Sequence, residues 1–269
     1  MHCGNDPYQE FLQTHRVFNT DELKQRFTVS GYQVKNLLTK LRKQGKIRKL
    51  RNRLYAVLPK YAKKHFMPPA LLMAAKMAPD AVLGYGAALD FYGMSRNLLF
   101  HVPFLTRHRL SKTQSDSITF YPCLPPKTLW AHGHDAFGVE EHLLWDTKIK
   151  VVCKERLLVD LLDRPDLSGG WESIANDFQY EKSLNFRKLV EYLHLLKHPA
   201  TSARVGFFLK RFQETMDVPE EVLLEIEGLK PKSPEYFYRT NRQGKFEKRW
   251  NLYVPEELFQ PLDEVNYEF

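Results

Sequence analysis

A stretch without any acidic residue separates Glu22 from Asp80 and carries 15 of the 40 Lys and Arg residues in this chain of 269 residues. Apolar residues inside it recur at the i, i+3, i+4 and i+7 spacing of one helix face: Val34, Leu37, Leu38 and Leu41. A basic run alone is most often a solvated surface. Here the basic residues coincide with a helix that must pack on one side only, and this favours a folded domain that binds a polyanion.

Start and stop signals around this helix predict a winged helix-turn-helix. Asn19 stands three residues before Glu22, a spacing typical of a capping box, and Gly45 is suited to end the basic helix. We expect a short strand at Val17-Phe18 and a two-stranded ribbon after Gly45. The full predicted order is helix 7–15, strand 17–18, helix 19–27, turn 28–31, helix 32–45, strand 47–49, turn 51–53 and strand 54–57.

The charge is unevenly divided along the chain. Residues 1–65 hold 15 Lys and Arg against four Asp and Glu, whereas residues 66–269 hold 25 against 28. A segment rich in Pro and Lys, residues 59–69, lies between the two compositions. We therefore predict a DNA-binding domain over 1–65 and a second, α+β domain over 66–269 that does not extend the DNA surface.

Residue types on the exposed side of the basic helix and on the ribbon suggest their roles. Asn and Gln side chains can pair with base edges, and Lys and Arg bind phosphates without selecting sequence. The candidates for base contacts are Tyr32, Gln33, Asn36 and Thr39. The candidates for phosphate contacts are Lys35, Lys40, Arg42, Lys43, Arg48, Lys49, Arg51 and Arg53.

Residues 66–269 alternate helical and strand patterns. The predicted helices are 69–77, 86–92, 155–162, 170–179, 186–194 and 200–213, and the predicted strands are 98–104, 117–121 and 148–152. Near the end, residues 236–239 and 250–254 flank Asn241-Arg242-Gln243-Gly244, which predicts a C-terminal β-hairpin.

The chain shows few signs of catalysis or of a membrane. His132 and His134 lie near several acidic residues, but their spacing defines no third metal ligand. Asp160 and Asp163 are better explained by capping or by ion pairs with Arg156 or Arg164. Three cysteines, no apolar span and no signal-peptide pattern favour a cytoplasmic protein, and we expect no cofactor, no metal and no membrane.

Seven stretches of the chain follow the order of motifs in one known family. In the first predicted domain they are residues 17–23 (VFNTDEL), 34–47 (VKNLLTKLRKQGKI) and 53–56 (RLYA). In the second they are residues 84–94 (GYGAALDFYGM), 151–162 (VVCKERLLVDLL), 203–209 (ARVGFFL) and 249–254 (RWNLYV). Through these stretches the chain resembles the AbiEi-type antitoxins of bacterial type IV toxin-antitoxin and abortive-infection operons. Asn52-Arg53 stand where that family often has a glycine before the second strand of the ribbon.

The resemblance implies a protein with two tasks and no enzymatic activity. The winged helix would repress its own operon by binding repeats in the promoter, and the second domain would oppose a nucleotidyltransferase-type toxin without requiring a stable complex. It assigns no residue to the antitoxin task. Two alternatives stay open: a winged-helix regulator that senses a small molecule, and a metal-dependent nucleic-acid hydrolase using the region of His132 and His134.

Overall fold

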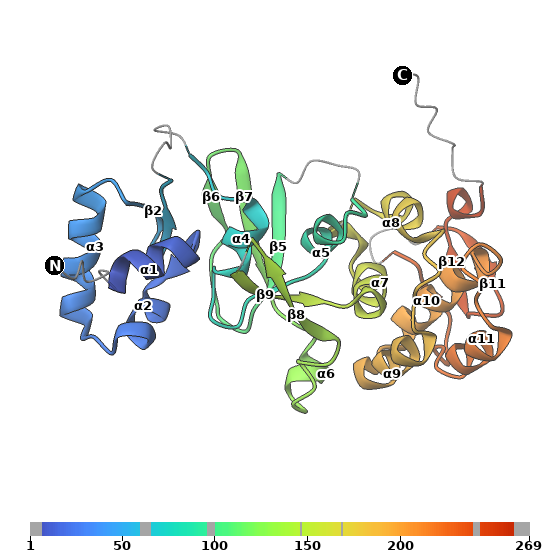
Figure 1. The fold of residues 1–269 in the computed structure, drawn as a ribbon. Helices are drawn as coiled ribbons and strands as arrows, with labels where there is room; N and C mark the ends of the chain where they lie inside the picture. Colours follow the sequence, from blue (N-terminus) through green and yellow to red (C-terminus); the bar gives the residue numbers. More distant parts are fainter. Residues whose placement is uncertain are drawn as a thin grey trace, which may run out of the picture. The chain divides into compact units, whose positions relative to one another are not determined.

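The computed structural model describes residues 7–59, 66–95, 100–145, 147–167, 169–238 and 243–260 (Figure 1). The chain forms two compact units. One unit comprises Met1–Leu83, Leu99–Leu124 and Glu140–Val151, and the other comprises Gly84–Leu98, Pro125–Val139 and Val152–Phe269. No helix in the described residues combines the length and the apolar character needed to cross a membrane.

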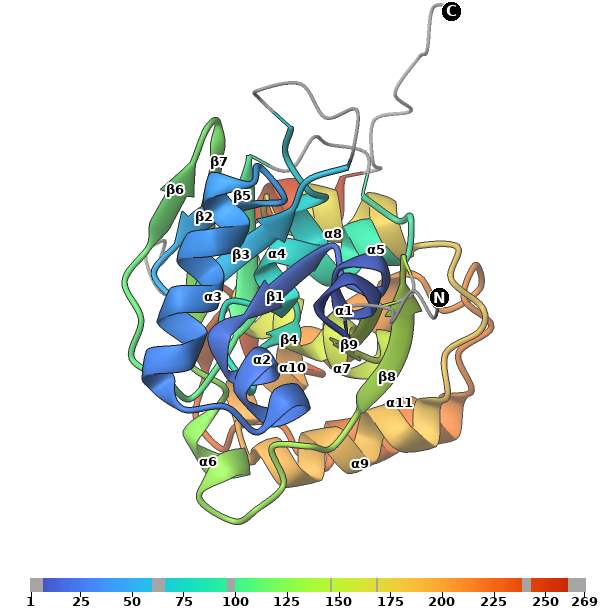
Figure 2. The same ribbon diagram turned by 60° about the vertical axis from the view of Figure 1, so that its left-hand side comes forward.

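The first unit begins with a winged helix-turn-helix, as predicted (Figure 2). Strands β1, β3 and β2 form an antiparallel sheet in that order, with Phe18 opposite Tyr55 and Arg48 opposite Ala56. The elements are α1 (Pro7–Thr14), β1 (Val17–Asn19), α2 (Thr20–Phe27), α3 (Gly31–Lys43), β2 (Ile47–Arg51) and β3 (Leu54–Val57).

Side-chain caps define where α2 and α3 begin. The Asn19 side chain accepts hydrogen bonds from the amides of Asp21 and Glu22, and Glu22 returns the bond to the Asn19 amide at 2.8 Å. This confirms the predicted capping box. A second capping box, between Ser30 and Gln33, opens α3. It was not predicted, because residues 28–31 were expected only to form a turn.

A single apolar cluster supports the winged helix. The apolar stripe of α3 packs into it, except that Leu37 is only partly buried. Each fully buried side chain of this size contributes roughly 1.5–3 kcal/mol. The cluster consists of Phe11, Phe18, Leu23, Val34, Leu38, Leu41, Ile47 and Tyr55.

A six-stranded mixed sheet follows, in the order β6-β7-β5-β4-β9-β8. Helix α4 (Ala70–Ala75) packs against β4 and β5. The strands are β4 (Val82–Leu83), β5 (His101–Leu105), β6 (Thr113–Ser115), β7 (Ile118–Cys123), β8 (Val139–Leu144) and β9 (Thr147–Val152). Three strands were predicted, with ends shifted by a few residues, whereas β4, β6 and β8 were missed.

Most of the sheet that follows the linker belongs to the same compact unit as the winged helix, and Lys76 forms an ion pair with Glu22 of α2. The division into domains at residue 65 stays a prediction. Residues 60–65 themselves lie outside the described residues.

The second unit is built mainly from helices around α10 (Pro199–Arg211), which is buried on all sides from Thr201 to Leu209. Helices α7 and α11 and strand β12 contact it. Its other helices are α5 (Gly86–Phe91), α6 (Lys127–Trp130), α7 (Lys154–Asp163), α8 (Trp171–Phe178), α9 (Phe186–Leu196) and α11 (Glu220–Glu227), with 3-10 turns at Pro165–Leu167 and Glu256–Phe259. Helices α6 and α11 were not predicted.

The predicted C-terminal hairpin is wrong in its pairing. Strand β10 (Glu235–Tyr236) runs parallel to β12 (Leu252–Val254), so these two segments do not form a hairpin. The antiparallel partner of β12 is β11 (Lys245–Glu247). The turn between β11 and β12 ends at Asn251, which takes a left-handed φ of 52°. It lies after the predicted turn at residues 241–244, of which residues 241–242 are outside the described residues.

Candidate nucleic-acid interface

Helix α3 presents one polar face because its apolar stripe is fixed in the core. All four residues expected to reach base edges, namely Tyr32, Gln33, Asn36 and Thr39, are exposed. At 74% exposure, Tyr32 is a large aromatic side chain left in solvent at the start of the helix. An exposed helix face with Asn, Gln and an aromatic residue has the groups that read base edges in the major groove.

Two of these four side chains are partly used within α3. The Gln33 carbonyl oxygen accepts a hydrogen bond from the Ser30 amide at 2.8 Å, and the Thr39 hydroxyl donates to the carbonyl of Lys35 at 2.8 Å. Tyr32 and Asn36 form no side-chain hydrogen bond with any residue in the described part of the chain. Asn36 therefore has both its donor and its acceptor available, and Gln33 retains mainly its NH₂ group.

Cations lie on both sides of this polar face. At 100° per residue, Lys35 and Arg42 lie on one flank of α3, Lys40 on the other and Lys43 near the middle. All four are exposed, and none forms an ion pair or a side-chain hydrogen bond with a described residue. Lys40, Arg42 and Lys43 stand in the last turn, where the helix dipole favours positive charge. The arrangement places possible base contacts between possible phosphate contacts.

A groove of about 340 Å³ runs along the flank of α3 that carries Lys35 and Arg42. Its floor includes Val34, Leu38 and Tyr55, and Lys24 of α2 adds a third cation. Lys24 was not among the predicted phosphate contacts, although it belongs to the same stretch without acidic residues. Lys24 lies 3.7 Å from Asp21, so part of its charge is already balanced.

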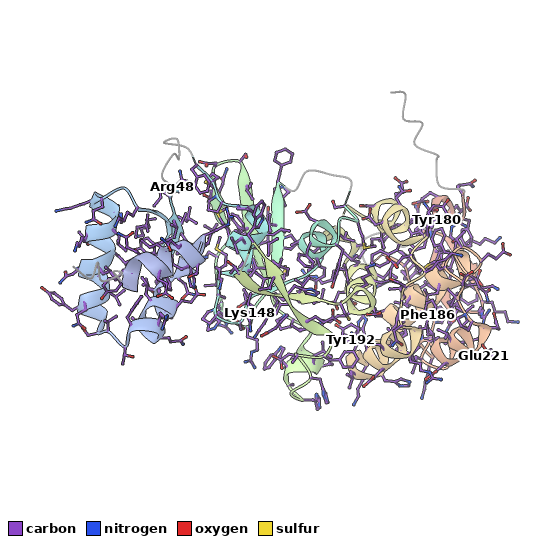
Figure 3. All side chains as sticks on the ribbon, viewed as in Figure 1. Arg48, Lys148, Tyr180, Phe186, Tyr192 and Glu221 are labelled. Carbon is purple, nitrogen blue, oxygen red and sulfur yellow. The ribbon has the colours of Figure 1, made fainter. Side chains whose placement is uncertain are left out.

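The wing is the ribbon of β2 and β3 with the turn between them, residues 47–57. Some of its candidate cations pair with no described residue, and we call these free; the others contact a neighbouring side chain, and we call these engaged. Lys49 on β2 is exposed and has no ion pair or hydrogen bond with any described residue. Arg48, labelled in Figure 3, donates to the Met67 sulfur, and Arg51 donates to the Met77 sulfur at 3.1 Å. These arginines are partly buried and hold the wing to the chain that follows it.

The third engaged cation, Arg53, sits at the wing tip. Its guanidinium contacts the Asp21 carboxylate at 2.5 and 2.7 Å, and its Nε lies 3.2 Å from the Thr20 hydroxyl. Its backbone adopts a left-handed φ of 65°. This is the position where the resembling family often carries glycine, and the arginine takes the conformation that glycine adopts most easily.

The other candidate sites of the sequence are structural or unsupported. In the described residues, no three His, Cys, Asp or Glu side chains are arranged to hold a metal ion. His132 instead places its Nδ1 2.8 Å from the Thr128 carbonyl. The hydrolase alternative therefore has no metal site in the part of the chain that the structure describes.

The Asp160 carboxylate belongs to a buried network in the second unit. Arg156 lies 3.3 Å from it, and Tyr192, which is labelled in Figure 3, donates to it at 2.6 Å. Arg156 also donates to the carbonyls of Asp135 and Phe137. Burial raises the pKa of Asp160, and the charge of Arg156 acts in the opposite direction. This confirms the expected ion pair between Arg156 and Asp160, which lies within α7. The whole network joins α7 to Tyr192 of α9 and to the segment before β8.

Comparison with known proteins agrees with this fold. Residues 7–54 match the model of a family described as FaeA-like protein, a helix-turn-helix type of domain. The chain is also similar to the crystal structure of the RV2827C protein from Mycobacterium tuberculosis, with 17% sequence identity, a TM-score of 0.56, and coverage of 91% of this chain and 89% of that chain. No curated protein matches the sequence. The chain thus has a mixed α+β fold, with an N-terminal winged helix-turn-helix of a DNA-binding type followed by a larger mixed α/β part.

Proposed function

We propose that this protein is a sequence-specific regulator that binds duplex DNA through α3. The observation that carries the proposal is the exposed polar face of α3, with cations on both of its flanks that pair with no described residue. In this arrangement α3 enters the major groove, Asn36 and Tyr32 meet base edges, and the flanking cations meet the phosphates. The match of residues 7–54 to a helix-turn-helix family supports the same role.

The finer proposal is that the protein represses its own operon and counteracts a nucleotidyltransferase-type toxin, without catalysis of its own and within the cytoplasm. Its support is the resemblance to AbiEi-type antitoxins. The four resembling stretches of the later chain fall on α5, β9 with α7, α10, and β12. Most of their apolar side chains are buried, so these stretches mainly build the fold, and they assign no residue to the antitoxin task.

A binding experiment on the full chain tests the DNA-binding proposal. The duplex upstream of the protein's own gene and a shuffled duplex of equal composition are titrated at several salt concentrations. We expect tighter binding to the upstream duplex and a steep loss of affinity with salt for both, because phosphate contacts release counterions. Equal affinity for the two duplexes would rule out a repressor that recognises its promoter.

Coexpression tests the antitoxin proposal separately. A nucleotidyltransferase-like reading frame next to the gene would be expressed alone and together with this chain. We expect growth arrest in the first case and recovery in the second. Recovery by a variant with Asn36→Ala and Lys43→Ala would show that neutralisation does not depend on DNA binding. A neighbour that is toxic in both cases would contradict the antitoxin role and leave DNA binding intact.

A further inference from the structure

A second group of cations lies outside the winged helix, in the loop that joins β5 to β6. No acidic residue occurs between Asp90 and Asp116, and the loop holds Arg107, Arg109 and Lys112. All three are exposed. We call residues 106–112 the basic loop.

Two cations of the basic loop have no carboxylate partner among the residues that the structure describes. Arg109 forms no ion pair and no side-chain hydrogen bond with any residue that the structure describes. Lys112 places its ammonium 4.5 Å from the ring centre of Tyr121, a cation-π contact that leaves its charge unbalanced. Both charges are therefore open to an anion from solution.

Asp80 orders the base of this loop and balances charge only there, at Arg107 and His108. One carboxylate oxygen accepts from the Thr106 hydroxyl at 2.6 Å, and the other accepts from the Arg107 amide at 2.8 Å. The Thr106 hydroxyl in turn accepts from the His108 amide at 3.1 Å. The Asp80 carboxylate also lies 4.0 Å from Nε of Arg107 and 3.6 Å from the His108 ring. The Asp80 carboxylate thus serves the start of the loop, and Arg109 and Lys112 follow this ordered start.

The basic loop lies beside the wing. A cavity of about 270 Å³ is lined by Arg51, Asn52 and Arg53 of the wing and by His108 and Leu110 of the loop. Asp21 also lines it, and its carboxylate balances the charge of Arg53. The wing and the loop belong to the same compact unit, and a phosphodiester backbone carries charges at regular short intervals that can contact both segments.

We propose that the basic loop contacts the phosphate backbone of duplex DNA next to the wing, so that the DNA interface extends beyond the winged helix. This inference rests on the proposed DNA-binding function, and it departs from the expectation that the chain after residue 65 adds nothing to the DNA surface. Arg109 and Lys112 provide two phosphate contacts that raise affinity without selecting sequence.

The test compares the unmodified chain with two double variants, each of which removes two positive charges. Arg109→Ala/Lys112→Ala changes the basic loop, and Lys232→Ala/Lys248→Ala changes two exposed lysines of the second unit. The measurement is the slope of the logarithm of the binding constant against the logarithm of salt concentration. The slope is negative, and each phosphate contact adds about 0.9 to its magnitude. We expect the magnitude to fall by about 1.8 in the loop variant and to stay unchanged in the control variant.

A third variant, Arg109→Lys/Lys112→Arg, retains the charge and should restore the slope. Matching thermal unfolding curves would show that all variants are folded. If the wild type binds no duplex, the proposed function fails and the inference fails with it. If the wild type binds DNA and the loop variant has the same slope as the control variant, the inference alone is overturned.

Discussion

Helix α3 and the second unit use their charged side chains in opposite ways. In the second unit Arg249 contacts the carboxylates of Glu220 and Glu227 at 2.7 and 3.1 Å, and Arg156 is buried against Asp160. On α3 the cations Lys35, Lys40, Arg42 and Lys43 have no such partner among the described residues. Like charges on neighbouring helix turns cost about 0.2–0.5 kcal/mol per pair, and the helix dipole offsets only part of this for the last turn.

This difference teaches that a charge count alone does not locate a binding surface. The second unit is also rich in cations, but its carboxylates hold many of them in place, so these side chains stabilise the fold. The α3 cations contribute little to the fold and are exposed, so their natural partner is an anion outside the chain.

Removing one partner of the buried pair should affect stability most. Asp160→Ala leaves the Arg156 guanidinium, which is 1% exposed, and the Tyr192 hydroxyl without their buried acceptor. We expect the free energy of unfolding to fall by about 3–5 kcal/mol, as for other broken buried pairs. Chemical denaturation followed by tryptophan fluorescence measures the change.

The matched control is Lys43→Ala on α3. It removes an exposed cation and should change stability by less than about 0.5 kcal/mol, while weakening DNA binding. The contrast between the two regions fails if both variants lose similar stability.

Two glycines give the next contrast. A Cβ on Gly206 in α10 would lie 2.1 Å from the ring of Trp250, which is buried, whereas a Cβ on Gly31 in α3 would meet nothing within 4 Å. We expect Gly206→Ala to lower stability by about 1–3 kcal/mol or more, because an overfilled core must shift. Gly31→Ala should raise it by up to about 1 kcal/mol, since alanine restricts the unfolded chain. Thermal unfolding of both variants checks the pair, and equal losses would contradict the packing argument.

Within the winged helix, Asn36 and Lys43 should differ in what they contribute. Asn36→Ala should reduce discrimination between the upstream and shuffled duplexes by about 1–3 kcal/mol, the range for a good contact with a base edge. Lys43→Ala should weaken both duplexes alike and lower the salt slope by about 0.9. Binding isotherms on both duplexes measure the two effects. A uniform loss for Asn36→Ala would move this residue from the base contacts to the phosphate contacts.

Local signals predicted the winged helix well, because its elements are specified by residues close in sequence. The Asn19 cap marks the start of α2, and Gly45, with a left-handed φ of 66°, follows the end of α3. The apolar stripe marks the face of α3 that packs into the core. Strand β8 was missed because Glu140, Glu141 and His142 interrupt any apolar alternation. Its place depends on pairing with β9 and not on its own pattern.

The division of the cations into free and engaged could not be predicted from sequence. The partners of Arg48 and Arg51 lie 19 and 26 residues away, and they are methionine sulfurs, which charge patterns do not reveal. The left-handed backbone of Arg53 was equally hidden, because nothing in the residue type suggests it.

Arg53 leads to the smallest expected effect. Arg53→Gly should relieve a left-handed backbone that costs a side-chain-bearing residue roughly 1–2 kcal/mol. It also removes an exposed ion pair with Asp21, typically worth about 0–1 kcal/mol, and makes the unfolded chain more flexible. We therefore expect a net stability change within about 1 kcal/mol, measured by chemical denaturation.

Two controls separate the terms. Arg53→Ala loses the ion pair but keeps the strained backbone, so it should be less stable than Arg53→Gly. For DNA binding the comparison is Lys49→Ala, which removes a free cation of the wing and should lower the salt slope by about 0.9. Because Asp21 already neutralises Arg53, the glycine variant should lose less of the slope than this. An equal loss would mean that Arg53 leaves Asp21 and contacts a phosphate when DNA binds. The engaged cations of the wing would then contribute to DNA binding as the free cations of α3 do.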